Sequence, residues 1–206
     1  MLFRSVAVGV TASQLAAKLA EATNASGKTL LDNGMPMVLV RAADFGITGN
    51  EAPEAMEAND ALRKKVEAIR LKIGPLMNLG DVTKKTVPKM CLVSAPVSGG
   101  AVNTRNFIPH RVHKAIGVFG AVSVATACVT PGSVCDGIAK VGKASGSIQL
   151  DVEHPTGFFT VEMEVEGQGA AVTVKRSALL RTARKLMSGE IYVPAFIWLA
   201  KAARAA

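Results

Sequence analysis

A cluster of basic and polar side chains between residues 105 and 114 is the part of the sequence best suited to chemistry. It directly precedes residues 115–129, a run of fifteen residues without a charge. If that run is a helix, its free N–H groups and the positive end of its dipole make its first turn an anion site. A carboxylate or an enolate would be stabilised there. The candidate substrate-binding residues around it are Arg105, His110, Arg111, His113 and Lys114.

The 115–129 run predicts a buried helix rather than a membrane span. Fifteen residues form a helix about 22 Å long, whereas the hydrocarbon core of a bilayer is about 30 Å thick. Pro131 and Gly132 follow the run, which is rich in small residues. A helix buried on all sides must satisfy its N-terminal donors with a partner, which favours the anion site. The alternative is that the histidines cap or pack and the cations face solvent.

The cysteines and histidines do not form a metal site or a disulfide pattern. Cys91, Cys128 and Cys135 are odd in number and contain no CxxC spacing, which indicates a reducing compartment. His110 and His113 are close together, but no third ligand stands at a zinc-site spacing. We therefore expect no metal. Cys128 and Cys135 fall at the far end of the predicted helix, where thiols are small apolar fillers.

The remaining patterns predict short strands and one further helix. Strands are expected at 28–31, 37–41, 90–94, 102–107, 148–152, 158–165, 171–175 and 190–193, with turns at 32–34 and 96–100. From Glu54 onward the pattern is helical. The predicted inward face is Leu62, Val66, Ile69, Ile73 and Leu76, and the predicted outward face is Arg63, Lys64, Glu67, Arg70 and Lys72. This set of elements predicts an α+β fold, a rolled β-sheet around a central buried helix.

The net charge and the low aromatic content favour a small anionic ligand over nucleic acid. The 206-residue chain has a net charge of +8, which would attract nucleic acid, anionic lipid or a polyanionic small molecule. Aromatic residues make up only 4%, too few for base stacking, so we expect no nucleic-acid partner. Residues 1–27 are rich in Ala, Ser and Thr and faintly like a mitochondrial transit peptide. An ordinary amphipathic helix or a truncation remnant is favoured there, with a cytoplasmic location.

Five ordered blocks resemble the second half of proteins of the PrpF family. They begin at residues 30, 73, 106, 152 and 181 with LLDNGMP, IGPLMNLGD, NFIPHRVHKAIG, VEHPTGFF and RTARKLMSG. The resemblance covers 28–194 as a PrpF-type second domain, with 1–27 as an extension or remnant and 195–206 as a C-terminal tail. It implies a diaminopimelate-epimerase-like fold of two similar domains, each wrapping strands around a central helix, with the active site between them.

The resemblance also implies where substrate binds. It places residues 109–114 and the helix start at the interdomain cleft, and residues 33–36 in a substrate-contacting turn. Asn33 and Met35 are therefore candidate substrate-binding residues. Met35 stands where relatives with the epimerase activity carry an asparagine, so only the location of the turn is carried over.

The implied reaction is a cofactor-independent isomerisation, a 1,3-allylic proton shift that interconverts keto and enol forms of the tricarboxylate 4-oxalomesaconate in gallate-type aromatic breakdown. The family's catalytic lysine and cysteine belong to its first domain, so we expect a truncated copy and assign no catalytic residue here. Alternatives are an isomerase acting on 2-methylaconitate or methylitaconate and a non-catalytic tricarboxylate-binding module. An exposed interdomain face would favour self-association.

Overall fold

The computed structural model describes residues 28–197, except residue 33 and the segments 143–144, 168–171 and 181–183. The predicted extension 1–27 and the end of the tail, 198–206, lie outside the described residues. In chain order the elements are β1 (Thr29–Asp32), β2 (Pro36–Arg41), the 3-10 helix η1 (Ala42–Phe45), α2 (Pro53–Ala58), α3 (Asp60–Leu76), β3 (Lys89–Ser94), β4 (Val102–Ile108), β5 (Arg111–Val112), α4 (Val118–Val129), β6 (Gly146–His154), β7 (Gly157–Glu166) and β8 (Thr173–Leu179).

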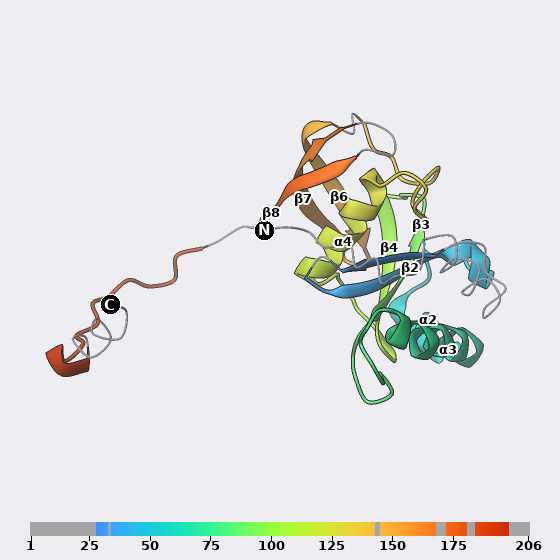
Figure 1. The fold of residues 1–206 in the computed structure, drawn as a ribbon, viewed down its shortest axis with the longest axis horizontal. Coiled ribbons are helices and arrows are strands. Elements are labelled where there is room, and N and C mark those ends of the chain that lie inside the picture. The colour runs from blue at the N-terminus through green and yellow to red at the C-terminus, as the bar shows by residue number, and fades with distance from the viewer. Residues whose placement is uncertain (1–27, 33, 143–144, 168–171, 181–183, 198–206) are drawn as a thin grey trace.

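The strands form one curled eight-stranded sheet, which confirms a mixed α+β fold (Figure 1). Their order is β1-β2-β3-β4-β6-β7-β8, and the short β5 pairs with β4. The β2–β3 and β4–β6 pairs are parallel, and the other pairs are antiparallel. Six of these strands follow the sequence prediction within two residues at each end, and β8 ends four residues beyond the predicted 171–175. The short β5 was not predicted, because two residues give no periodic signal.

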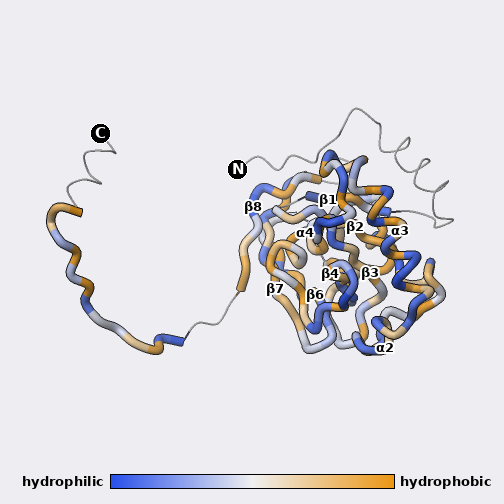
Figure 2. The backbone as a smooth tube through the Cα atoms, turned by 90° about the horizontal axis from the view of Figure 1, so that it is seen from below, coloured by the Kyte–Doolittle hydropathy of each residue, from blue (hydrophilic) through white to orange (hydrophobic). Residues whose placement is uncertain are grey.

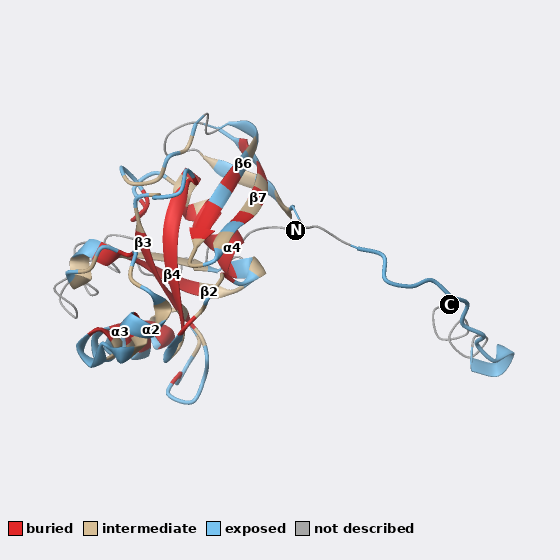
Figure 3. Cartoon of the chain, turned by 180° about the vertical axis from the view of Figure 1, so that it is seen from behind, coloured by how far each residue is buried: buried red, intermediate tan, exposed pale blue. Residues whose placement is uncertain are grey.

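Successive residues of the central strands enter two different cores. In β2, Met37 and Leu39 belong to the larger core, and Val38 and Val40 belong to the smaller one. The larger core contains the buried side chains of α4, and the smaller core contains those of α2 and α3. Because both faces of these strands are covered, β2, β3 and β4 are buried along most of their length (Figure 3).

Helix α4 is built from the uncharged run but begins three residues later than predicted, at Val118. Residues 113–117 form the approach to it and carry the chain from β5 to the helix. Of its twelve residues, eight are buried, most of them small, whereas Phe119 in the first turn is 53% exposed. The N-terminal end of α4 is thus the part of the helix that reaches solvent. No helix in the described part of the chain is long and apolar enough to cross a membrane.

Helix α3 confirms the predicted inward face and corrects one residue of the outward face. Leu62, Val66, Ile69 and Ile73 are buried as expected. Arg70, predicted to face solvent, is fully buried. Its Nη1 donates to the carbonyl oxygens of Val82, Lys85 and Val87, each at 3.0 Å, and Glu67 pairs with the rest of the guanidinium. The prediction failed because the periodicity of one helix does not reveal that the 79–88 loop folds over it.

The described residues from 184 to 197 run away from the body of the molecule (Figure 1). The strand predicted at 190–193 is wrong, because these residues form no ladder within the described chain and are exposed. Seven large apolar side chains are exposed between residues 184 and 197, and the hydrophobic positions of this segment are visible in Figure 2. They are Leu186, Met187, Ile191, Tyr192, Val193, Phe196 and Ile197.

Candidate functional site

The candidate site is the first turn of α4. Gly117 caps the helix in an extended conformation and provides no side-chain cap, and its carbonyl accepts the first intrahelical bond from the N–H of Ala121 at 2.9 Å. The preceding N–H groups have no acceptor within the helix, and they carry the positive end of its dipole. Gly117 and Phe119 are exposed, so this end of the helix is open to an incoming anion.

The turn between β1 and β2 lies directly against this end of α4. Gly34 has φ +86°, and a Cβ placed on it would lie 2.9 Å from Cδ1 of Phe119. The backbone of the turn therefore packs on the phenylalanine ring at a distance that only glycine permits. Met35 is half-buried and packs against the larger core, while Asn33 lies outside the described residues. Two segments about 85 residues apart in sequence thus meet at one site.

The cationic residues after β4 lie along the surface between this site and α2. Lys114 Nζ is 3.1 Å from Glu54 Oε1, and Arg111 Nε is 3.8 Å from Glu57 Oε1. The pKa of the Glu54 carboxyl is held below its usual value by its own backbone N–H at the start of α2 and by Lys114. His110 is exposed in the β4–β5 turn. Arg111 and Lys114 therefore contribute a positive field that two carboxylates partly offset.

His113 is fixed by the backbone of the helix approach. Its Nδ1 accepts a hydrogen bond of 2.9 Å from the N–H of Ala115. The next residue, Lys114, accepts a hydrogen bond of 2.8 Å at its carbonyl from Thr156 Oγ1 in the β6–β7 hairpin. This contact brings the end of β6 against the loop that leads into α4.

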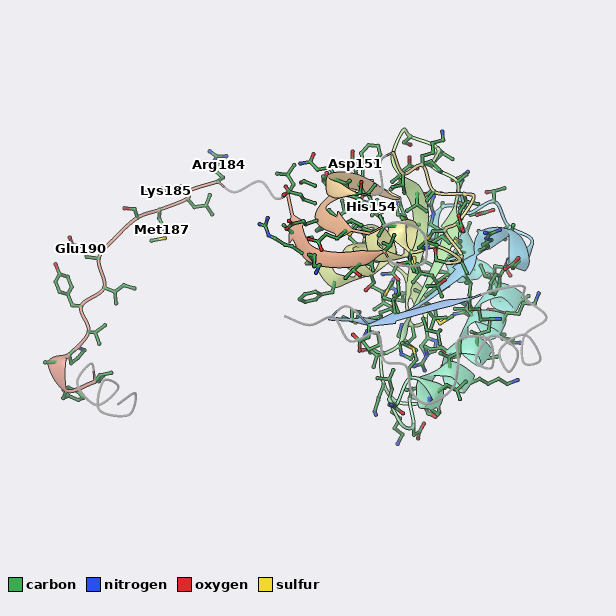
Figure 4. The ribbon with its side chains drawn as sticks, turned by 45° about the horizontal axis from the view of Figure 1, so that its top comes forward. Asp151, His154, Arg184, Lys185, Met187 and Glu190 are labelled. Carbon is green, nitrogen blue, oxygen red and sulfur yellow. The ribbon has the colours of Figure 1, made fainter. Side chains whose placement is uncertain are left out.

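His154, which sequence reasoning assigned only to a turn, lies at the end of β6 (Figure 4), close enough to His113 and Arg105 for their charges to act on it. Burial lowers the pKa of His154, and the positive charges of His113 and Arg105 lower it further, against a hydrogen bond to the backbone of Phe158 that raises it. His154 is therefore neutral near neutral pH. The residues His154 to Gly157, with the sequence HPTG, are typical of a turn, and nothing in this pattern indicates another role for the histidine.

Arg105 points to the face of β4 opposite α4. Its Nε donates to the carbonyl of Glu51 at 2.8 Å, and its Nη1 donates to Asn103 Oδ1 at 3.0 Å and to the carbonyl of Thr104 at 2.9 Å. It borders a cavity of about 180 Å³ whose lining includes Ser98, Asn103, Glu153, His154 and Phe158. No residue of α4 lines that cavity. Arg105 is thus close in sequence to the other cations but separated from the first turn of α4 by the sheet.

Cys128, in the last turn of α4, lies close to Cys135, and both lie near Cys91 of β3. Burial raises the pKa of the Cys91 thiol, and a hydrogen bond with Cys135 together with burial raises that of Cys128. Thiols with raised pKa values are poor nucleophiles. In the described residues, no three His, Cys, Asp or Glu side chains form a group that could hold a metal. The chemistry of the site is therefore that of hydrogen-bond donors and positive potential.

Comparisons with known proteins agree on one family. The model of the PrpF protein family matches residues 12–194. The 4-oxalomesaconate tautomerase of Pseudomonas putida is 54% identical over 170 residues, which cover 82% of this chain and 46% of that protein. The (4E)-oxalomesaconate Delta-isomerase of a Novosphingobium species is 56% identical over 165 residues, which cover 80% of this chain and 45% of that protein.

A solved structure shows the same fold. Methylitaconate-delta-isomerase superposes with a TM-score of 0.67 at 22% identity, over 81% of this chain and 46% of that one. The chain thus spans less than half the length of the relatives it matches. Because the family model covers most of the chain and the relatives share more than half of the aligned residues, the chain belongs to the PrpF family.

Proposed function

We propose that residues 28–194 are the substrate-binding half of an isomerase that interconverts keto and enol 4-oxalomesaconate by a 1,3-allylic proton shift. Support comes from the 54% and 56% identity to two proteins named for reactions of oxalomesaconate. The methylitaconate isomerase shares only 22%, which places action on methylitaconate or 2-methylaconitate second. In this proposal, 28–194 is the second domain of a diaminopimelate-epimerase-like fold and α4 is its central helix.

The observation that carries the proposal is the contact between the Gly34 turn and Phe119 at the open end of α4. Removing a proton next to a carbonyl group creates an enolate, and preorganised donors stabilise the charge as it develops. The free N–H groups of the first turn of α4 are such donors, and they are held in place by the helix. A multiply charged acid bound there would be enclosed on one side by Gly34 and Met35.

The remaining predicted residues have distinct parts in this proposal. His113 and Lys114 flank the approach to α4, and Arg111, next to the exposed His110, extends the positive region along the surface toward α2. Arg105 contributes its charge through the sheet rather than a direct contact. This field attracts a tricarboxylate and orients it.

The reaction also needs a base and a proton donor. The family resemblance assigns both to the first domain. We therefore expect negligible turnover of 4-oxalomesaconate by this chain alone and only weak binding of the acid. An ultraviolet assay of enol formation measures the first, and turnover at the rate of a two-domain relative would contradict the assignment.

An NMR titration of the chain with 4-oxalomesaconate tests the binding site. We expect the amide resonances of Val118, Phe119 and Gly120 to shift most. The variant Gly120→Ala provides the matched comparison, since its methyl would meet Ile116 at 3.4 Å and Asn106 at 3.6 Å, ordinary contact distances. Alanine is the better helix former by about 0.5–1 kcal/mol, so the variant should fold at least as stably as the wild type. It should bind the acid more weakly, because the added methyl group stands beside the first-turn N–H groups that hold the acid.

Two results would contradict the proposal. One is the absence of shifts at the first turn of α4 at millimolar acid, and the other is equal affinity in Gly120→Ala. A non-catalytic binding module is distinguished by selectivity, because a sensor of carboxylates in general would bind tricarballylate as tightly as 4-oxalomesaconate.

A further inference from the structure

Asn106 is a buried polar residue whose oxygen has no partner. Its side chain is 4% exposed, and its Oδ1 makes no hydrogen bond in the described structure. It lies in the middle of the sheet on β4, where it pairs with Cys91 of β3. Cys91 belongs to the larger core, so this register turns Asn106 toward the α4 side of the sheet.

The carboxamide of Asn106 reaches the first turn of α4. Its Nδ2 lies 3.6 Å from the position that a Cβ would occupy on Gly120, the third residue of the helix. Its backbone is held there, because the carbonyl of Asn106 accepts a hydrogen bond of 2.8 Å from the N–H of His113. A polar group fixed beside a helix end, and left unpaired, costs stability unless a ligand completes it.

The chemistry of Asn106 differs from that of its surroundings. The helix N–H groups and the lysine and arginine side chains can only donate hydrogen bonds, whereas the oxygen of a carboxamide accepts them. An organic acid whose carboxylates occupy the donors would leave this acceptor unused. A ligand that also carries a hydroxyl group would satisfy both the N–H donors of the helix and the acceptor oxygen of Asn106.

We propose that Asn106 accepts a hydrogen bond from a hydroxyl group of the polycarboxylate bound at the first turn of α4. The inference rests on the proposed function, in which that hydroxyl is the enol O–H of 4-oxalomesaconate. Asn106 then distinguishes the enol form from the keto form, whose carbonyl oxygen has no proton to donate. It is a binding residue with selectivity for a hydroxyl group.

Citrate and tricarballylate form a matched pair of probes, because both carry three carboxylates on a three-carbon chain and differ by one hydroxyl. Their affinities for the chain are measured by NMR titration at a pH that ionises all carboxyls. We expect the wild type to bind citrate roughly 3- to 10-fold more tightly, the value of one hydrogen bond. In Asn106→Leu, both acids should bind with the affinity of tricarballylate.

The same variant separates a binding role from a structural one. Since Asn106→Leu removes an unpaired oxygen, its thermal unfolding midpoint should be no lower than that of the wild type; a structural hydrogen bond would make it lower. Asn106→Ala serves if the larger side chain prevents folding. Ser123→Ala is the control, because Ser123 is also buried with an unpartnered oxygen but lies a turn deeper in α4. It should keep the preference for citrate.

The outcomes distinguish this inference from the proposed function. Equal affinity of the wild type for the two acids, or a preference that survives in Asn106→Leu, overturns the role of Asn106 and leaves the tricarboxylate site intact. Absence of binding of either acid overturns the site itself and the inference with it.

Discussion

The environment of a single charged residue depends on its partners rather than on its place in a helical pattern. Arg70 occupies a position that the sequence assigns to solvent, yet it holds three carbonyl oxygens of the 79–88 loop against α3. A guanidinium can do this because it presents several donors in one plane. Val82 of this loop is buried against Gly74 of α3, and the guanidinium of Arg70 fixes the backbone at Val82 and beyond it.

Replacing Arg70 by methionine should therefore lower the free energy of unfolding by about 3–5 kcal/mol, the usual effect of removing one partner from a buried charged network. Chemical denaturation measures it. Lys64→Met on the same helix is the control, since Lys64 is exposed and its loss should have little effect. A loss from Arg70→Met no larger than that of the control would contradict the role given to Arg70.

His154 gives the protein a specific pH dependence. Its pKa in the folded protein is lowered from 6.5 by burial and by the positive charges of His113 and Arg105. The unfolded chain therefore binds a proton at a higher pH than the folded chain does. The stability that neutral His154 contributes is complete above pH 6.5, the ordinary pKa of histidine. It declines as the pH falls from this value toward the lower pKa of the folded protein.

The variant His154→Gln removes this titration. Between neutral pH and the folded pKa of His154, the unfolding free energy of the wild type should fall more steeply than that of the variant. Denaturant titrations across this range provide the comparison. Parallel pH profiles would show that His154 titrates alike in the folded and unfolded chains.

Among the elements, β6 pairs with β4 and is also linked to the turn between β3 and β4 by a buried carboxylate. Glu153 of β6 accepts hydrogen bonds of 2.8 Å from the backbone N–H groups of Val97, Ser98 and Gly100, which form the β3–β4 turn. Gly100 is required here, because a Cβ would lie 2.6 Å from Cγ of Glu153 and 2.7 Å from the carbonyl of Asp151. The turn is thus fixed by a partner more than 50 residues away.

The substitution Glu153→Gln should destabilise the protein by about 1–3 kcal/mol, because an amide NH₂ would replace an acceptor opposite N–H donors. Hydrogen exchange of the Val97, Ser98 and Gly100 amides should accelerate more than exchange in α3. Asp151→Asn on the same strand, where the carboxylate is exposed and pairs with Thr160 Oγ1, is the control. Unchanged exchange at the turn would show that Glu153 does not hold it.

On the scale of the whole molecule, the described part of the chain consists of one body with an extended segment. The segment 184–197 projects away from the body, as the labelled residues from Arg184 to Glu190 show (Figure 4). Leu186 and Met187 are each 85% exposed, and Ile191 is 90% exposed. Exposed apolar side chains in such density are typical of surfaces that another polypeptide covers.

We therefore predict that the purified chain associates with itself through this segment. Light scattering after size exclusion should show a mass that rises with protein concentration. Replacing Leu186, Met187, Ile191 and Tyr192 by serine should shift it toward the monomer without lowering the unfolding midpoint. A mass of 21.4 kDa at every concentration would contradict the prediction.

The sequence alone determined the local elements and the family. Short continuous apolar runs indicated β2 and β3, and a helical apolar pattern indicated the inward face of α3, because burial of those side chains decides the local conformation. The uncharged run fixed α4, although its start was misplaced by three residues that no capping side chain marks. Ordered blocks of residues identified the PrpF family, which no single element could do.

The tertiary structure decided which residues meet. The packing of Gly34 on Phe119, the position of Asn106 beside Gly120 and the separation of Arg105 from α4 depend on strand order and register. The burial of Arg70 depends on the 79–88 loop folding over α3. A change of register by one residue would exchange the two faces of β4 and place Arg105 where Asn106 lies. Local patterns record which side chains prefer to be buried, whereas contacts between distant segments arise only when the sheet is assembled.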